Sequence, residues 1–288
     1  MTAGILVNLH RPDAIEAAQK AVSILQSFGH QAFVEREAAA ATELSAIGAS
    51  EMHDCDLLIS IGGDGTLLRA GHLCAAQQIP ILGVAYGTFG FITPCQPEQM
   101  EEALVSFIEG RHRTESRMMV QTHLIRADKV VAELHALNES VVQRSATTRL
   151  LVFTVLVNGY LVARYPADGV MVATPTGSTA YSLSAGGPVV DPRLEALLVT
   201  GLMPHTLSAR PLVLPADSTI EIQIHTRGES HGGAVLSSDG QSRLHLLSGD
   251  KLVLTRSPRR VKLVTLEEDD FLQKLPSRLN WAGGKGFE

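Results

Sequence analysis

Apolar and polar residues alternate along the first third of the chain in blocks that predict a strand and then a helix, several times over. Short apolar runs predict strands at 4–8, 31–34, 57–61 and 79–84. Between them, apolar positions at helical spacing predict helices at 13–28 and from 66 to about 78. Strands that alternate with helices build a parallel, doubly wound sheet, which binds ligands at the carboxyl ends of its strands.

Beyond a predicted helix at about 97–109, the pattern changes to strands joined by hairpin turns. Asn158-Gly159 separates two apolar strands, and Asp239-Gly240 marks another turn. We therefore predict an α/β domain with a doubly wound parallel sheet at 1–97 and a β-rich domain of layered sheets at 98–264. A C-terminal helix at about 265–288 can pack back on the first domain.

Composition narrows the class of protein. The chain has 288 residues, 45% of them hydrophobic, which is enough for a sizeable core. Its net charge of −6 argues against a nucleic-acid binder, so any phosphate site must be built locally. The three cysteines show no disulfide or metal-ligand pattern, which favours a reducing, cytoplasmic setting. The stretch 169–190 is uncharged, but its proline and glycines argue against a membrane-spanning helix.

One candidate site follows the strand at 57–61, where glycines surround a carboxylate. The run Gly62-Gly63-Asp64-Gly65-Thr66 leads from this strand into a helix. Free N–H groups at a helix start attract anions, and glycines let the backbone approach a phosphate closely. Beside a phosphate, Asp64 has two chemical uses: to hold a divalent cation, or to take a proton from an attacking hydroxyl. The alternative is that Asp-Gly is only a favourable turn pair.

A second candidate site lies in the β-rich half, where hydroxyl side chains and glycines interrupt an apolar stretch. Residues 168–188 run through a buried strand into a loop rich in Thr, Ser and Gly. Such a loop can hold ribose hydroxyls, phosphates or the edge of an adenine ring. Asn138-Glu139, next to another apolar strand, can bind two ribose hydroxyls or a base amine. The alternatives are helix capping by Ser178 and Thr176, and a polar strand end at Asn138-Glu139.

Several short motifs follow one another along the chain in an order that is itself informative. They lie at 62–66, 87–91, 138–139, 168–188, 204–208, 210–212 and 239–241. In this order they resemble the motifs of the NAD kinase family, also called inorganic polyphosphate/ATP-NAD kinases. Gly-Gly-Asp-Gly is shared with phosphofructokinases and diacylglycerol-type lipid kinases, so it is moderately specific. The run Thr-Pro-Thr-Gly-Ser-Thr-Ala-Tyr at 174–181 is highly specific.

The resemblance implies a kinase that transfers the terminal phosphoryl group of ATP, or of polyphosphate, to the 2′-hydroxyl of the adenosine ribose of NAD, giving NADP. It implies Asp64 as the general base, an active site between the two domains, and a homodimer or homotetramer. With a net charge of −6, we expect Mg²⁺ to neutralise the phosphates. We expect neither a nucleic-acid nor a membrane partner.

The site residues fall into two groups. The phosphate loop comprises Gly62, Gly63, Gly65 and Thr66. The resemblance places on the nucleotide substrates Gly65, Asn138, Glu139, Arg149, Asp168, Thr179, Ala180, Tyr181, Ser182, Leu183, Ser184 and Gln241. Arg69 lies one helical turn past the glycine loop and can face phosphate; this expectation comes from helical spacing and not from the resemblance.

Several alternatives stay open. The donor is ATP or polyphosphate and the acceptor is NAD or NADH. Ala85 stands where many bacterial relatives carry Asn, and Tyr165-Pro166-Ala167 lacks a basic residue that some relatives have before Asp168. One rival is a lipid or sugar kinase, although the chain shows no amphipathic membrane-facing element and a sugar kinase does not need the 168–188 loop. The other is a dinucleotide sensor without activity, against which an intact Asp64 argues.

Overall fold

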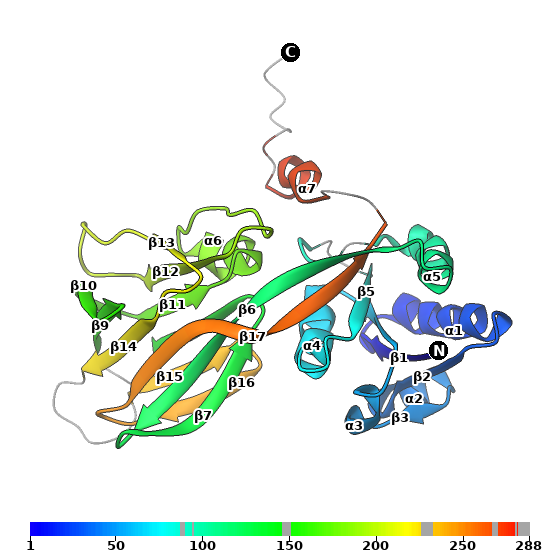
Figure 1. Ribbon diagram of the computed structural model, residues 1–288, viewed down its shortest axis with the longest axis horizontal. Coiled ribbons are helices and arrows are strands. Elements are labelled where there is room, and N and C mark those ends of the chain that lie inside the picture. The colour runs from blue at the N-terminus through cyan, green and yellow to red at the C-terminus, as the bar shows by residue number, and fades with distance from the viewer. Residues whose placement is uncertain are drawn as a thin grey trace, which may run out of the picture. The chain divides into compact units, whose positions relative to one another are not determined.

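The computed structural model describes residues 1–86, 90–93, 95–145, 151–225, 233–266, 270–279 and 281. The chain forms two compact units, one of residues 1–117 with 260–288 and the other of 118–259. Helix α5 (Met100–Ile108) joins the first unit because its apolar face shares a core with α1 (Pro12–Ser27) (Figure 1). Within the described residues, no helix is both long and apolar enough to cross a membrane.

The first unit is built on a parallel sheet with the strand order β5-β4-β1-β2-β3. Every residue of β4 is buried, as the continuous apolar run predicts. The end of β17 (Lys251–Thr265) adds a further parallel strand beside β5. The remaining elements of this unit are β1 (Thr2–Val7), β2 (Gln31–Glu35), η1 (Arg36–Ala38), α2 (Ala39–Thr42), β3 (Ala46–Ile47), α3 (Ala49–Met52), β4 (Leu57–Gly62), α4 (Asp64–Cys74), β5 (Pro80–Ala85), η2 (Pro97–Gln99) and α7 (Asp270–Arg278).

The strand order reverses at β1, which has β2 on one side and β4 on the other. The carboxyl ends of β1 and β4 therefore form a topological switch point, where such sheets bind ligands. Helix α4 starts directly after β4 and has Gly63 as its N-cap, so Asp64 occupies its first turn. The helix ends at Cys74, earlier than the sequence pattern predicts, because a turn follows in which Gln78 has a φ of 56°.

The second unit consists of antiparallel strands in two sheets that share one core. One sheet has the order β13-β12-β11-β8-β15-β16, and the other includes β10-β9-β14-β17 and the β6-β7 hairpin. Phe153 and Ile222 from one sheet pack with Val142 and Val170 from the other. The elements are β6 (Arg113–Arg126), β7 (Lys129–Ala136), β8 (Glu139–Arg144), β9 (Leu151–Val157), β10 (Tyr160–Ala167), β11 (Gly169–Ala173), η3 (Thr176–Thr179), α6 (Tyr181–Ser184), β12 (Ala196–Leu202), β13 (Leu212–Pro215), β14 (Ile220–His225), β15 (Ala234–Ser238) and β16 (Ser242–Leu246).

The predicted fold class is confirmed: an α/β half with a parallel sheet precedes a β-rich half of layered antiparallel sheets. Asn158-Gly159 connects β9 and β10 with φ angles of 51° and 82°. Both angles are positive, as the predicted hairpin turn requires. The C-terminal helix α7 begins at Asp270 and not near Thr265, because Thr265 is still the last residue of β17.

Candidate functional site

A pocket of about 380 Å³ lies at the switch point of the parallel sheet. Residues 7–10, which are the last residue of β1 and the loop after it, line one part of the pocket, and the glycine loop with the first turns of α4 lines another. The lining residues are Val7, Asn8, Leu9, His10, Gly63, Gly65, Thr66 and Arg69. Three of the four residues predicted for the phosphate loop therefore face this pocket, together with Arg69.

Two glycines of the loop serve different purposes. A Cβ atom on Gly62 would lie 2.5 Å from Thr66 Oγ1, so only glycine lets the strand approach α4 this closely. At Gly65, by contrast, a Cβ atom would meet no protein atom within 4 Å. Because the first N–H groups of a helix lack partners within the helix, the start of α4 presents donors and a positive dipole end for an anion. The pocket is therefore suited to phosphate.

Arg69 lines the pocket and is held there by a buried carboxylate. Arg69 Nη2 lies 2.7 Å from Glu35 Oε1, and the same oxygen accepts the N–H of Val7 at 3.0 Å. Only 10% of the Glu35 side chain is exposed, whereas 43% of the Arg69 side chain is. The ion pair fixes Arg69 at the pocket wall and leaves part of its guanidinium accessible. The sequence motifs did not single out Glu35, although its place at the carboxyl end of β2 was a usable signal.

The carboxylate of Asp64 contacts a second loop, residues 90–93, of the same unit. Oδ2 accepts the N–H of Phe91 at 3.1 Å, while Oδ1 accepts the N–H of Thr93 at 3.2 Å and its hydroxyl at 2.7 Å. A Cβ atom on Gly90 would lie about 2 Å from the carboxylate oxygens, so glycine is required there. A carboxylate offers about four acceptor positions. These three bonds therefore leave one position, on Oδ2.

In the second unit, three loops meet at one edge of the sheet that contains β8. The strands β8, β11 and β15 are antiparallel neighbours, so the start of β8 lies beside the ends of β11 and β15. Asn138-Glu139, the segment 174–184 and the turn at 239–241 are brought together in this way. The structure thus assembles most of the residues that the sequence predicts for dinucleotide binding.

Asp239 and Thr174 hold Asn138-Glu139 in place. Asp239 accepts the N–H groups of Leu137, Asn138 and Glu139 at 2.7, 2.8 and 3.1 Å. The Thr174 hydroxyl donates to the Leu137 carbonyl at 2.5 Å, and the Thr174 N–H donates to the Asn138 carbonyl at 2.8 Å. Neither residue was among the predicted binding residues. Both belong to motifs noted in the sequence, but their role depends on backbone contacts that a sequence does not show.

The side chains of Asn138 and Glu139 each bury an acceptor atom that has no partner. Within the described residues, neither Asn138 Oδ1 nor Glu139 Oε2 accepts a hydrogen bond, although the two residues are only 6% and 7% exposed. Burial, and then the negative charge of Asp239, raise the pKa of Glu139 to about 7, while the Tyr181 N–H opposes this rise. Buried polar atoms are normally paired. These two oxygens are therefore suited to accept hydrogen bonds from a ligand.

The remaining predicted residues occupy different places. Thr179 ends η3, Ala180 links it to α6, and Tyr181, Ser182, Leu183 and Ser184 form α6. The Ser182 hydroxyl is buried and has no partner among the described residues, whereas Tyr181 is 45% exposed. Gln241 donates its N–H to the Ser238 carbonyl in the turn after Asp239. Arg149 and residues 87–89 lie outside the described residues.

Asp168 lies at the opposite edge of this sheet from Glu139. It precedes β11, and its Oδ1 pairs with Nε of Arg144 at 2.7 Å at the end of β8. Glu139 is paired with the other end of β11, at Ala173. A strand rises about 3.4 Å per residue, so the two edges are about 17 Å apart. Within one chain, Asp168 therefore does not meet the Asn138-Glu139 pair.

Comparisons with known proteins match this arrangement to one family over nearly the whole chain. A model of the ATP-NAD kinase N-terminal domain matches residues 3–112, and a model of the ATP-NAD kinase C-terminal domain matches residues 137–266. The chain belongs to the NAD kinase family. The NAD kinase of Moorella thermoacetica is 37% identical over 284 residues, which cover 98% of this chain and 90% of that protein. The NAD kinase of Gemmatimonas aurantiaca is 40% identical over 232 residues, which cover 80% of this chain and 79% of that protein.

Solved structures of the NAD kinase family share the fold. Yeast NADH kinase complexed with NADH is 29% identical and superposes with a TM-score of 0.91, covering 100% of this chain and 89% of that one. An NAD kinase from Archaeoglobus fulgidus in complex with ATP is 24% identical and superposes with a TM-score of 0.78. The match covers 97% of this chain and 99% of that one. The predicted family is confirmed, and the chain is an enzyme of that family. These matches favour the NAD kinase family over the lipid-kinase, sugar-kinase and sensor alternatives.

Proposed function

We propose that this chain transfers the γ-phosphoryl group of ATP to the 2′-hydroxyl of the adenosine ribose of NAD, forming NADP and ADP. The acceptor site is inferred from two buried oxygens, one on Asn138 and one on Glu139, which accept no hydrogen bond from any described residue. The adenine amino group and the ribose hydroxyls of NAD are donors, and these oxygens are acceptors. A dinucleotide bound here would satisfy both atoms, which otherwise stay buried at a cost.

The donor phosphates are assigned to the switch-point pocket. The start of α4 supplies N–H donors and a positive dipole end, and Arg69 supplies a positive charge at the wall. A divalent cation, Mg²⁺, would neutralise the phosphate charge when bound. Within the described ranges, no group of three or more His, Cys, Asp or Glu side chains is placed to hold a metal. We therefore expect phosphate oxygens and water to supply most ligands of this ion, as is common for Mg²⁺.

Asp64 is the proposed general base. Its remaining acceptor position on Oδ2 can receive the proton of the 2′-hydroxyl while that oxygen bonds to the γ-phosphorus. The bond between the γ-phosphorus and the bridging oxygen to the β-phosphate breaks, and ADP leaves. The Phe91 and Thr93 donors hold the carboxylate still, so that it meets the hydroxyl in one orientation. For this reaction, Asp64 and the Asn138-Glu139 pair must act on the same two substrates, ATP and NAD.

The test measures NADP formation from NAD, ATP and Mg²⁺, read through an NADP-specific dehydrogenase. Polyphosphate as the donor and NADH as the acceptor are assayed in parallel. We expect turnover in the wild type, and a loss of about 10²-fold or more in Asp64→Asn with NAD affinity retained, the scale of a lost general base. Asp54→Asn removes an exposed carboxylate and should match the wild type. Near-normal turnover in Asp64→Asn would show that Asp64 is not the base.

We also infer that the enzyme works as a homodimer or homotetramer. Strand β10 is the end strand of its sheet, and Tyr160 and Leu161 on it are 77% and 64% exposed. In an oligomer, Asp168 of a second copy can complete the dinucleotide site that one chain leaves without it. Light scattering coupled to size-exclusion chromatography measures the molar mass and so the number of subunits. Mixing inactive Asp64→Asn with inactive Asp168→Asn restores activity if Asp168 acts across copies, and restores none if it acts within one chain.

A further inference from the structure

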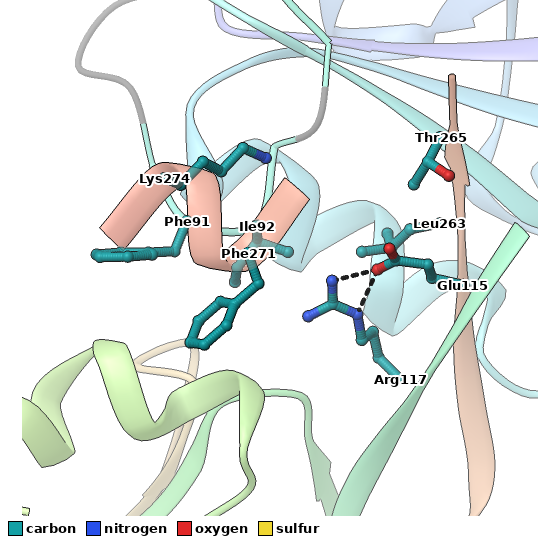
Figure 2. Close-up of a pocket in the computed structure, with 8 residues that line it drawn as sticks. All are labelled: Phe91, Ile92, Glu115, Arg117, Leu263, Thr265, Phe271 and Lys274. Carbon is teal, nitrogen blue, oxygen red and sulfur yellow. Dashed lines mark hydrogen bonds and ion pairs between the residues drawn. The ribbon is translucent and has the colours of Figure 1, made fainter. Parts of the chain in front are cut away.

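The C-terminal helix α7 packs against the loop that binds Asp64. Its residues Phe271 and Lys274, one helical turn apart, line a small pocket together with Phe91 and Ile92 of that loop (Figure 2). The rings of Phe271 and Phe91 are in contact, with centroids 6.5 Å apart and planes tilted by 48°. The next residue, Leu272, does not line this pocket and is 54% exposed. The helix therefore presents Phe271 to the loop and Leu272 to solvent.

The residue that Phe271 contacts also touches the proposed base. The Phe91 N–H donates to Asp64 Oδ2 at 3.1 Å, so the ring of Phe91 meets α7 while its backbone meets the carboxylate. The loop approaches Asp64 so closely at Gly90 that a Cβ atom would lie about 2 Å from the carboxylate. The loop and the carboxylate therefore have little room to move relative to each other. A shift of Phe91 would move a hydrogen-bond donor of Asp64, or the carboxylate itself.

The two ends of this loop are supported differently. After the loop, Cys95 is fixed by the backbone of β5: its N–H donates to the Gly83 carbonyl at 3.1 Å, and its carbonyl accepts the Ala85 N–H at 2.9 Å. Ile92 is buried. Phe91 is only partly buried, and its ring packs against the ring of Phe271. Within the described part of this loop, α7 therefore supports Phe91, whereas backbone hydrogen bonds with β5 hold the chain at Cys95.

We propose that Phe271 is a positioning residue for phosphoryl transfer: it fixes Phe91, and through the Phe91 N–H it fixes the orientation of the Asp64 carboxylate. This rests on the proposed role of Asp64 as general base. A general base works only from a narrow range of positions, and a misplacement of about 1 Å can cost up to 10²-fold in rate. We expect the effect in kcat, because the contact of Phe271 leads to Asp64, whereas Asn138 and Glu139, which are assigned to NAD binding, belong to the other unit.

The test compares Phe271→Ala with Leu272→Ala, a truncation on the exposed side of the same helix. We expect Phe271→Ala to lower kcat about tenfold, with the KM and Kd for NAD within about twofold of the wild type. Leu272→Ala should keep wild-type kinetics. Hydrogen exchange, followed by mass spectrometry on peptides that span 90–93, should become faster in Phe271→Ala alone. Phe271→Leu, which keeps an apolar side chain, should lose less activity than Phe271→Ala.

A double-mutant cycle separates positioning of Asp64 from a general structural role. On the Asp64→Asn background, Phe271→Ala should cause no further loss of turnover. An equal loss on both backgrounds, or a raised KM for NAD with kcat unchanged, would overturn the proposal, as would unchanged exchange at 90–93. Wild-type turnover in Asp64→Asn would instead refute the base assignment. The exchange measurement would still decide whether Phe271 holds the loop.

Discussion

Replacing Glu139 with Gln should stabilise the protein near neutral pH and have little effect in acid. Burial and the charge of Asp239 raise the pKa of Glu139 from 4.5 to about 7. The folded protein therefore keeps a proton on this carboxyl between these two values, where the unfolded chain has lost it. The free energy of unfolding must then fall as the pH rises from 4.5 to about 7. At 1.36 kcal/mol per pH unit, the loss amounts to about 3 kcal/mol.

The assay is urea unfolding of the ligand-free protein, followed by circular dichroism in buffers from about pH 5 to 8. The difference in unfolding free energy between Glu139→Gln and the wild type should grow with pH by up to about 3 kcal/mol. Glu16→Gln, which removes an exposed glutamate from α1, controls for the loss of one charge. Parallel pH profiles for Glu139→Gln and the wild type would refute the reasoning. Saturating NAD should reduce the pH dependence, because ligand donors stabilise the ionised carboxylate.

Three further predictions concern residues that form or support the two candidate sites. Asn138→Ala should raise the Kd for NAD about tenfold, measured by calorimetry, because it removes an acceptor worth about 1 to 1.5 kcal/mol; an unchanged Kd would place NAD elsewhere. Thr93→Val, which keeps the volume but removes the 2.7 Å hydrogen bond to Asp64, should lower kcat several-fold without changing the KM for NAD. A change confined to KM would contradict this role. Glu35→Gln weakens the ion pair that holds Arg69, so the KM for ATP should rise while that for NAD stays constant; equal changes in both would indicate a wider disturbance.

The sequence predicted the parts of this enzyme that depend on local pattern. Apolar periodicity predicted the strand–helix alternation. The Asn158-Gly159 pair predicted a hairpin turn, because its residues tolerate positive φ angles. The glycine loop at 62–66 predicted an anion site, since it joins a buried strand to a helix start. The order of the motifs then gave the family. Each of these signals lies within a few neighbouring residues, which is why one sequence suffices to read it.

Contacts between segments far apart in the chain were decided only by the tertiary structure. The pairing of Asp64 with Thr93, of Arg69 with Glu35 and of Asp239 with Leu137 joins residues that are 29, 34 and 102 positions apart. The separation of Asp168 from Glu139 depends on their lying at opposite ends of β11. Hydrogen bonds of this kind form between any compatible donor and acceptor, so residue types alone do not select the partner. The sequence determined which chemical groups this kinase carries, and the packing of its sheets and loops determined which of them meet.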